Sequence, residues 1–150
     1  MKVLIHGAAG RVRPALRPLL VRAVAAAFRS EKRRPAGAIH VILTDRPTIK
    51  RLNRQFLDET GDTDVIAFGY DVEPGAPRGD FADIYISVPT AADNARRFGE
   101  DAERELVRLA VHGTLHLLGH DDHAAGPRAK MWKRQEALVE RLLPAKGRPR

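Results

Sequence analysis

The sequence predicts a single α/β domain in which a small mixed sheet of about four strands packs with about five helices. The chain has 150 residues, 43% hydrophobic and 30% charged, which is the balance of one ordinary globular domain. Short runs rich in β-branched residues alternate with longer segments whose apolar residues recur at helical spacing. No repeat or long linker interrupts this pattern. We therefore expect residues 1–150 to form one domain, with a basic tail from about residue 144.

The first half of the chain predicts the order strand, helix, strand, helix. Residues 1–6 form a short apolar strand that ends at the glycines of 7–10, and a helix over 14–30 has Pro14 in its first turn. After a charged turn, the β-branched run over 38–43 predicts a second strand. Thr44 or Asp45 can cap a following helix over 47–56.

The second half predicts two strands followed by three helices. A polar turn over 58–63 leads into a buried strand over 64–68. A loop rich in glycine and proline separates this strand from an alternating one over 81–87. Helices are expected over 88–98, ended by Gly99, and over 101–118, ended by Gly119. A last helix begins at Gly126 and Pro127.

Charge and composition narrow the function classes. The formal net charge is +7, and much of the excess lies in the first third and the C-terminal tail. Such an excess favours a polyanion such as nucleic acid, although an arginine-rich solvated surface gives the same count. The chain has no cysteine, so a metal site must use His, Asp or Glu. We see no membrane span and no signal-peptide layout, so we expect a cytoplasmic protein.

Four of the six histidines fall within residues 112–123. His112 and His116 lie one turn apart on the predicted helix, so both can bind one ion with zinc–nitrogen distances near 2.0–2.1 Å. Gly119 ends that helix and lets a residue of the loop return to the same ion. This pattern favours a catalytic zinc with a free position for water over hydrogen-bonded core histidines or a structural zinc.

The residues around the histidines also bear on the reaction. A zinc-activated water supplies hydroxide at neutral pH. A peptidase of the H-E-x-x-H type is disfavoured, because its general base would stand at position 113, where this chain has Gly113. If the loop supplies a third histidine, three neutral imidazoles leave the ion its full charge, which suits an anionic phosphodiester.

Three stretches of the chain form a recognisable set: LNRQF with TDVIAF within residues 52–68, ADIYIS over 82–87, and HGTLHLLGHDDH over 112–123. They are similar to LNxxY…PTDVLSF, GDIxIS and HGxLHLxGYDH of the YbeY family of bacterial metal-dependent endoribonucleases, which the chain therefore resembles. The resemblance implies one zinc ion per chain at three histidines, and single-stranded RNA as substrate. It also implies a role in 16S rRNA 3′-end maturation and ribosome quality control, with small-subunit components as partners. Asp64 and Asp83 match family positions, and we expect them to cap turns rather than catalyse.

Two of the chain's departures from the family pattern bear directly on the site. The family's third histidine lies six positions after the second, which here is Asp122, and His123 is one further. We expect His123 to be the third ligand, because a one-residue loop insertion costs little. Asp122 would then accept a proton, or it would be the third ligand in place of His123. Leu57 stands where the family tends to carry an arginine suspected of gripping phosphate. Arg51 and Arg54 on the preceding helix are candidate RNA contacts in its place, and the alternative, which we favour, is that both are solvated surface residues. The alternative to an enzyme is an RNA- or ribosome-binding assembly factor with a structural metal.

Overall fold

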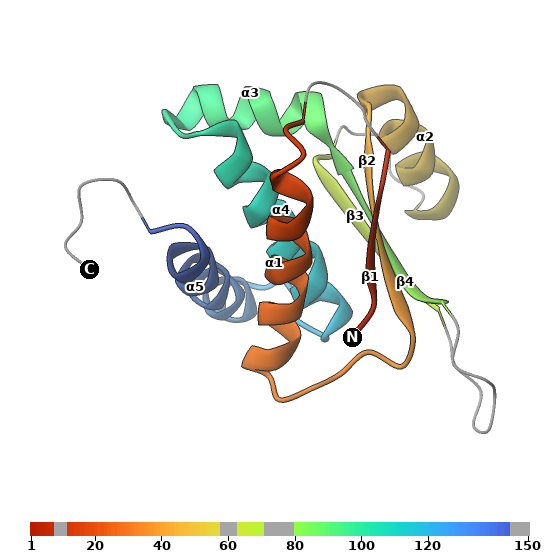
Figure 1. The fold of residues 1–150 in the computed structure, drawn as a ribbon, viewed down its shortest axis with the longest axis vertical. Coiled ribbons are helices and arrows are strands. Elements are labelled where there is room, and N and C mark those ends of the chain that lie inside the picture. Colours follow the sequence, from red (N-terminus) through yellow and green to blue (C-terminus); the bar gives the residue numbers. More distant parts are fainter. Residues whose placement is uncertain (8–11, 58–62, 71–79, 145–150) are drawn as a thin grey trace.

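Four strands form one mixed sheet in the computed structural model, which describes residues 1–7, 12–57, 63–70 and 80–144 (Figure 1). The strands are β1 (Val3–His6), β2 (Ala38–Thr44), β3 (Val65–Gly69) and β4 (Asp80–Ser87), in the order β1-β2-β4-β3. The first, second and fourth run parallel, and β3 pairs antiparallel with β4. The mixed sheet predicted from the sequence is confirmed.

Five helices accompany the sheet within the described residues: α1 (Leu16–Ser30), α2 (Arg46–Leu57), α3 (Val88–Phe98), α4 (Ala102–Leu117) and α5 (Ala125–Leu142). Figure 1 shows α1 and α4 on one face of the sheet and α2 on the other. Helix α5 packs against α4 and α1, and α3 packs against α4. Among the described helices, none combines the length and the apolar character that a membrane crossing requires.

The core lies between the sheet and the face formed by α1 and α4. Alternate residues of β2 are buried, as the alternating pattern requires, and β4 buries Ile84 and Ile86 completely. Helix α4 approaches β4 closely at Gly113. A Cβ atom there would lie 2.8 Å from Cγ2 of Ile84 and 3.3 Å from Cγ2 of Val65. The glycine therefore sets how close α4 comes to the sheet and fixes the height of His112 above it.

The helix boundaries follow the local signals of the sequence with one shift. Asp45 caps α2, since its Oδ1 accepts a hydrogen bond from the Thr48 amide at 2.9 Å. Gly99 ends α3 in the left-handed conformation, with φ of 65°. Helix α1 begins at Leu16, so Pro14 lies in the turn before the helix rather than in its first turn. The turn over 58–63, the loop over 69–80 and the basic tail lie largely outside the described residues.

Candidate metal centre and adjoining cavity

A left-handed turn at the end of α4 brings the following loop back towards the helix. Gly119 has φ of 99°. Its amide donates to the carbonyl of His116 at 3.0 Å, and the amide of His120 donates to the carbonyl of Leu115 at 3.0 Å. These are the two hydrogen bonds of a Schellman motif, for which glycine is the favoured residue. The chain reverses here, and Asp122 comes to lie beside the last turn of α4.

Three side-chain atoms converge at this point. Nε2 of His112 and Nε2 of His116 are 3.0 Å apart, and Oδ2 of Asp122 lies 3.6 Å from the first and 3.4 Å from the second. In a tetrahedral zinc site with bonds near 2.0–2.1 Å, neighbouring ligand atoms are separated by about 3.3 Å. The three observed separations therefore match one face of a zinc coordination tetrahedron.

The hydrogen bonds of the two imidazoles decide which ring nitrogen carries the proton when each ring is neutral. Nδ1 of His112 faces Oε1 of Gln135 at 2.7 Å, and Nδ1 of His116 faces the carbonyl of His120 at 3.0 Å. Both partners are acceptors, so each neutral ring carries its proton on Nδ1. Burial lowers the pKa of His112 and keeps that ring neutral. Two bare nitrogens and a carboxylate oxygen thus face one point, an arrangement that a cation satisfies.

Residues just after α1 hold the end of α4 and the loop that carries Asp122. The side chain of His120 pairs with Glu31, and the Arg33 guanidinium donates to the carbonyl of Leu118 at 3.0 Å. The hydrogen bond from His120 holds the pKa of Glu31 below its usual value. His120 thereby anchors the loop to the residue that follows α1.

The structure groups Asp122, rather than His123, with the two helix histidines. His123 is exposed, and its amide donates to Oδ1 of Asp121 at 2.9 Å. Its ring belongs to a second group of potential ligands, formed with Asp121 and Asp122, which shares only Asp122 with the first. No group of potential metal ligands among the described residues contains His112, His116 and His123 together.

The arginines predicted to contact RNA lie elsewhere. Arg51 and Arg54 are exposed on α2, and neither lines the cavity beside the histidines. Leu57 is the last residue of the same helix and is 47% exposed.

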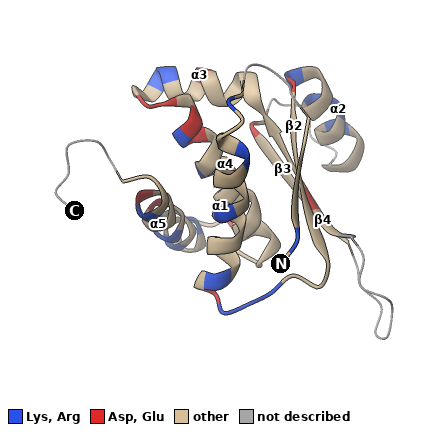
Figure 2. Cartoon of the chain, in the orientation of Figure 1, with Lys and Arg blue, Asp and Glu red and all other residues tan. Residues whose placement is uncertain are grey.

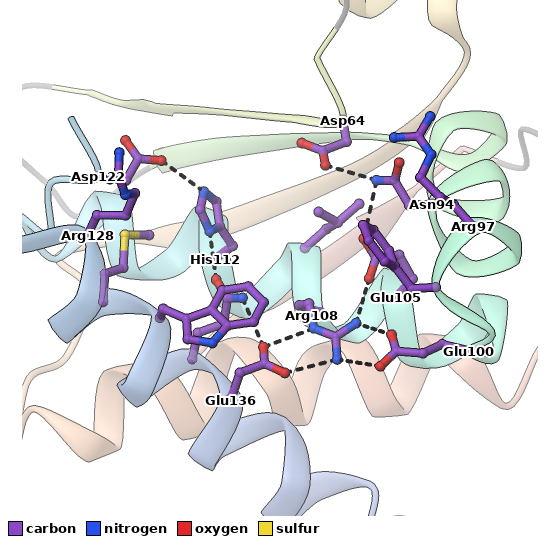
Figure 3. Close-up of a pocket in the computed structure, with 15 residues that line it drawn as sticks. Asp64, Asn94, Arg97, Glu100, Glu105, Arg108, His112, Asp122, Arg128 and Glu136 are labelled. Carbon is purple, nitrogen blue, oxygen red and sulfur yellow. Dashed lines mark hydrogen bonds and ion pairs between the residues drawn. The ribbon is translucent and has the colours of Figure 1, made fainter. Parts of the chain in front are cut away.

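A cavity of about 650 Å³ adjoins the histidines and is shown in Figure 3. Its lining residues come from α3, α4, α5 and the segments beside them: Asp64, Asn94, Arg97, Phe98, Glu100, Glu105, Arg108, Leu109, His112, Asp122, Arg128, Met131, Trp132, Gln135 and Glu136. Because His112 and Asp122 both line it, a molecule in the cavity would lie next to the candidate metal ligands.

A continuous hydrogen-bonded network follows the wall of this cavity (Figure 3). From His112 it passes to Gln135, whose Nε2 donates to Glu136 at 3.0 Å, and then to Arg108, whose Nε donates to Glu136 at 2.9 Å. Arg108 also donates to Glu105 at 2.6 Å and pairs with Glu100.

The far end of the network holds Asp64. Asn94 donates to Glu105 at 3.3 Å and to Asp64 at 3.1 Å. From the sequence we expect Asp64 to have a structural role. In the structure its side chain also lines the cavity. Asp83, by contrast, accepts a hydrogen bond from the Tyr70 hydroxyl, and it does not line the cavity.

Burial and pairing act in opposite directions on the charged groups of this network. Burial alone would lower the pKa of Arg108, but hydrogen bonds to Glu136, Glu100 and Glu105 outweigh it and raise that pKa. Burial raises the pKa of Glu105, which Arg108 only partly offsets. The same guanidinium holds the pKa of Glu100 below its usual value. Arg108 is therefore the charge that keeps three carboxylates together behind the cavity.

Sequence reasoning did not identify Gln135 or Arg108 as parts of the site. Gln135 is 2% exposed and lies on the α5 face that also buries Met131 and Leu138. A glutamine among apolar residues on one helix face was a signal that the position needs a polar partner. Arg108 lies one turn before His112 within an apolar stretch of α4, which was a similar signal.

The family model and the sequence relatives agree on one family. The sequence matches the family model described as Endoribonuclease YbeY over residues 10–143. The Endoribonuclease YbeY of Chlorobaculum parvum is 41% identical over 106 residues, which cover 71% of this chain and 72% of that protein. That of Chlorobium luteolum is 37% identical over 125 residues, covering 83% and 88%. The solution structure of TM1509 from Thermotoga maritima has a TM-score of 0.59 at 25% identity and covers 99% of both chains.

Proposed function

The chain belongs to the YbeY family of endoribonucleases, and from this we propose that it hydrolyses single-stranded RNA with one zinc ion held by His112, His116 and Asp122. The observation that carries the proposal is the convergence of two imidazole nitrogens and a carboxylate oxygen, 3.0–3.6 Å apart, beside a cavity. The sequence alone favoured His123 as the third ligand. The turn at Gly119 supports Asp122, which stands at the family's usual spacing from His116.

Each residue of the site has a defined task in this proposal. His112 and His116 present Nε2 from adjacent turns of α4, and Asp122 adds an oxygen from the loop. When bound, zinc supplies a Lewis acid that activates water and polarises a phosphoryl oxygen. The carboxylate leaves the site one net positive charge, which still favours an anionic phosphodiester. In this proposal Asp122 is a metal ligand, so its carboxylate holds the ion in position and does not transfer a proton.

We infer the biological role of the protein from that of the YbeY family. We propose that the substrate is the 3′ region of precursor 16S rRNA and that the protein acts in ribosome quality control with small-subunit components, which would place it in the cytoplasm. The basic surplus of the chain supports binding to RNA without sequence readout, because contacts to phosphate fix position and not sequence.

Elemental analysis of purified protein tests the metal site. The wild type and His123→Ala should each carry one zinc ion per chain, and Asp122→Ala should lose it. Loss in His123→Ala with retention in Asp122→Ala would move the third ligand to His123. If the wild type binds no metal when zinc is added, the hydrolase proposal fails, and an RNA-binding assembly factor becomes the better account.

Cleavage assays test the reaction separately. Zinc-loaded wild type should cut single-stranded RNA, and His116→Ala should be inactive while keeping the same circular dichroism spectrum. Wild-type cleavage by His116→Ala would overturn the site assignment. Cleavage of casein by a preparation that leaves RNA intact would instead support a zinc peptidase.

A further inference from the structure

Two aromatic side chains in the wall of the cavity are exposed. Trp132 on α5 is 57% exposed and Phe98 at the end of α3 is 67% exposed, and both line the cavity that reaches His112 and Asp122. Large aromatic side chains contribute most when they are covered, so this much exposure beside a cavity indicates a surface that a ligand covers. The cavity, at about 650 Å³, lies within the range of small-molecule sites.

Each aromatic side chain has an arginine beside it. Arg97 precedes Phe98 in the last turn of α3, and Arg128 lies one helical turn before Trp132 on α5, where positions four apart are neighbours. Figure 3 shows the two arginines at opposite ends of the cavity, with Arg128 at the end that holds His112. The cavity is therefore bounded by two arginine–aromatic pairs, one from each helix.

These two arginines differ from Arg108, which the carboxylates of the cavity wall surround. Arg97 and Arg128 are exposed, and within the described part of the chain neither forms a salt bridge. Two unneutralised guanidinium groups at the rim suit phosphate groups, which they can bind bidentately.

The interior of the cavity has the opposite character. Glu100, Glu105 and Glu136 share the single guanidinium of Arg108, so the wall carries an excess of acceptors. Figure 2 shows acidic residues gathered where α3 meets α4. Such a wall repels a phosphate, but it accepts hydrogen bonds from the amino and imino groups of a nucleobase. Charge thus separates a place for bases inside from places for phosphates at the rim.

We propose that this cavity binds nucleotides of single-stranded RNA next to the cleaved bond, with bases stacked on Trp132 and Phe98 and flanking phosphates on Arg128 and Arg97. The inference rests on the proposed function and adds a substrate-binding subsite to it. Stacking tolerates any base, because every base has a π-face, so the subsite selects unpaired strands without selecting sequence. A duplex keeps its bases stacked on one another and cannot place them there.

The composition of the chain offers a direct readout, because Trp132 is its sole tryptophan. Metal-free protein kept in a chelator is titrated with a short single-stranded oligoadenylate, so that no cleavage occurs. Tryptophan fluorescence should be quenched to saturation at the RNA concentration where the anisotropy of labelled RNA also saturates. The same strand in a duplex should leave the fluorescence unchanged. RNA binding without quenching would overturn the proposal, as would equal quenching by polyglutamate.

Substitutions then measure each part of the subsite by anisotropy. Trp132→Ala should weaken RNA binding by about 5- to 150-fold, which corresponds to 1–3 kcal/mol per stacked base. Phe56→Ala is the matched control, because Phe56 is 59% exposed but lies on α2 outside the cavity, and it should change affinity less than about twofold. Equal effects of the two substitutions would contradict the subsite.

The arginines are tested by salt dependence. Arg128→Gln and Arg97→Gln should each reduce the slope of log affinity against log salt by about 0.7, and Arg141→Gln, an exposed arginine of α5 outside this cavity, should not. These binding measurements need no zinc, so their failure is distinct from failure of the proposed reaction. A protein that binds zinc and cleaves RNA, yet shows no quenching and no loss in Trp132→Ala, would keep its function and lose this subsite.

Discussion

Replacing Gln135 by leucine should weaken zinc binding and leave the fold in place. Glu136 can only accept hydrogen bonds, so the amide nitrogen of Gln135 points to it and the amide oxygen faces Nδ1 of His112. This orientation keeps the proton of His112 on Nδ1 and its Nε2 free for the ion. Loss of such a partner of a metal-binding histidine lowers metal affinity by about 10- to 100-fold, or about 1.4–2.7 kcal/mol.

Competition with a chromophoric zinc chelator measures this affinity. Gln55→Leu provides a matched control, because Gln55 is the other glutamine of the chain and is exposed on α2. It should bind zinc as the wild type does. Urea unfolding of the metal-free proteins checks that Gln135→Leu remains folded. A folded Gln135→Leu protein whose zinc affinity lies within twofold of the wild type would refute the reasoning, since the acceptor would then have no part in orienting His112.

Three further substitutions probe the fold around the site. Arg108→Met should lower the free energy of unfolding by about 3–5 kcal/mol because it leaves buried carboxylates unpaired, whereas Arg13→Met, at a side chain 71% exposed, should change it little in the same urea titration. Glu100→Gln should destabilise the protein by about 1–3 kcal/mol at neutral pH. Because the folded-state pKa of Glu100 is depressed below 4.5, the difference from wild type should persist above that pH and vanish as the pH falls through the lowered value; a constant difference down to acid pH would contradict this. Gly113→Ala should cost about 1–3 kcal/mol through its contact with Ile84, and a melting temperature equal to that of the wild type would show that α4 can move away from the sheet.

The order of helices and strands could be predicted from the sequence because each element carries a local signal. The β-branched run of β2, the cap at Asp45 and the glycine at 99 each act within a few residues of where they stand. Hydrophobic periodicity and capping are local properties, and the structure follows them.

The composition of the site could be predicted only in part. Helical spacing brings His112 and His116 together, and that much is local. The choice between Asp122 and His123 depends on how the chain turns after Gly119, where a shift of one residue redirects a side chain. Gln135 reaches His112 from a helix 23 positions further along the chain, through packing that no local pattern encodes. Contacts of this kind become visible only once α5 is placed against α4.

The close approach of α4 to the sheet also limits which side chains position 113 can hold, and so which reactions the site can carry out. Position 113 is where zinc peptidases carry the glutamate that serves as general base, and here that position faces Ile84 and Val65 with less room than a methyl group needs. A glutamate would have to bury its carboxylate against two aliphatic side chains or push the helix off the strand, and the helix carries both histidines. A single substitution therefore cannot convert this scaffold to peptidase chemistry. A glutamate at this position would first require that the packing between α4 and the sheet be rebuilt.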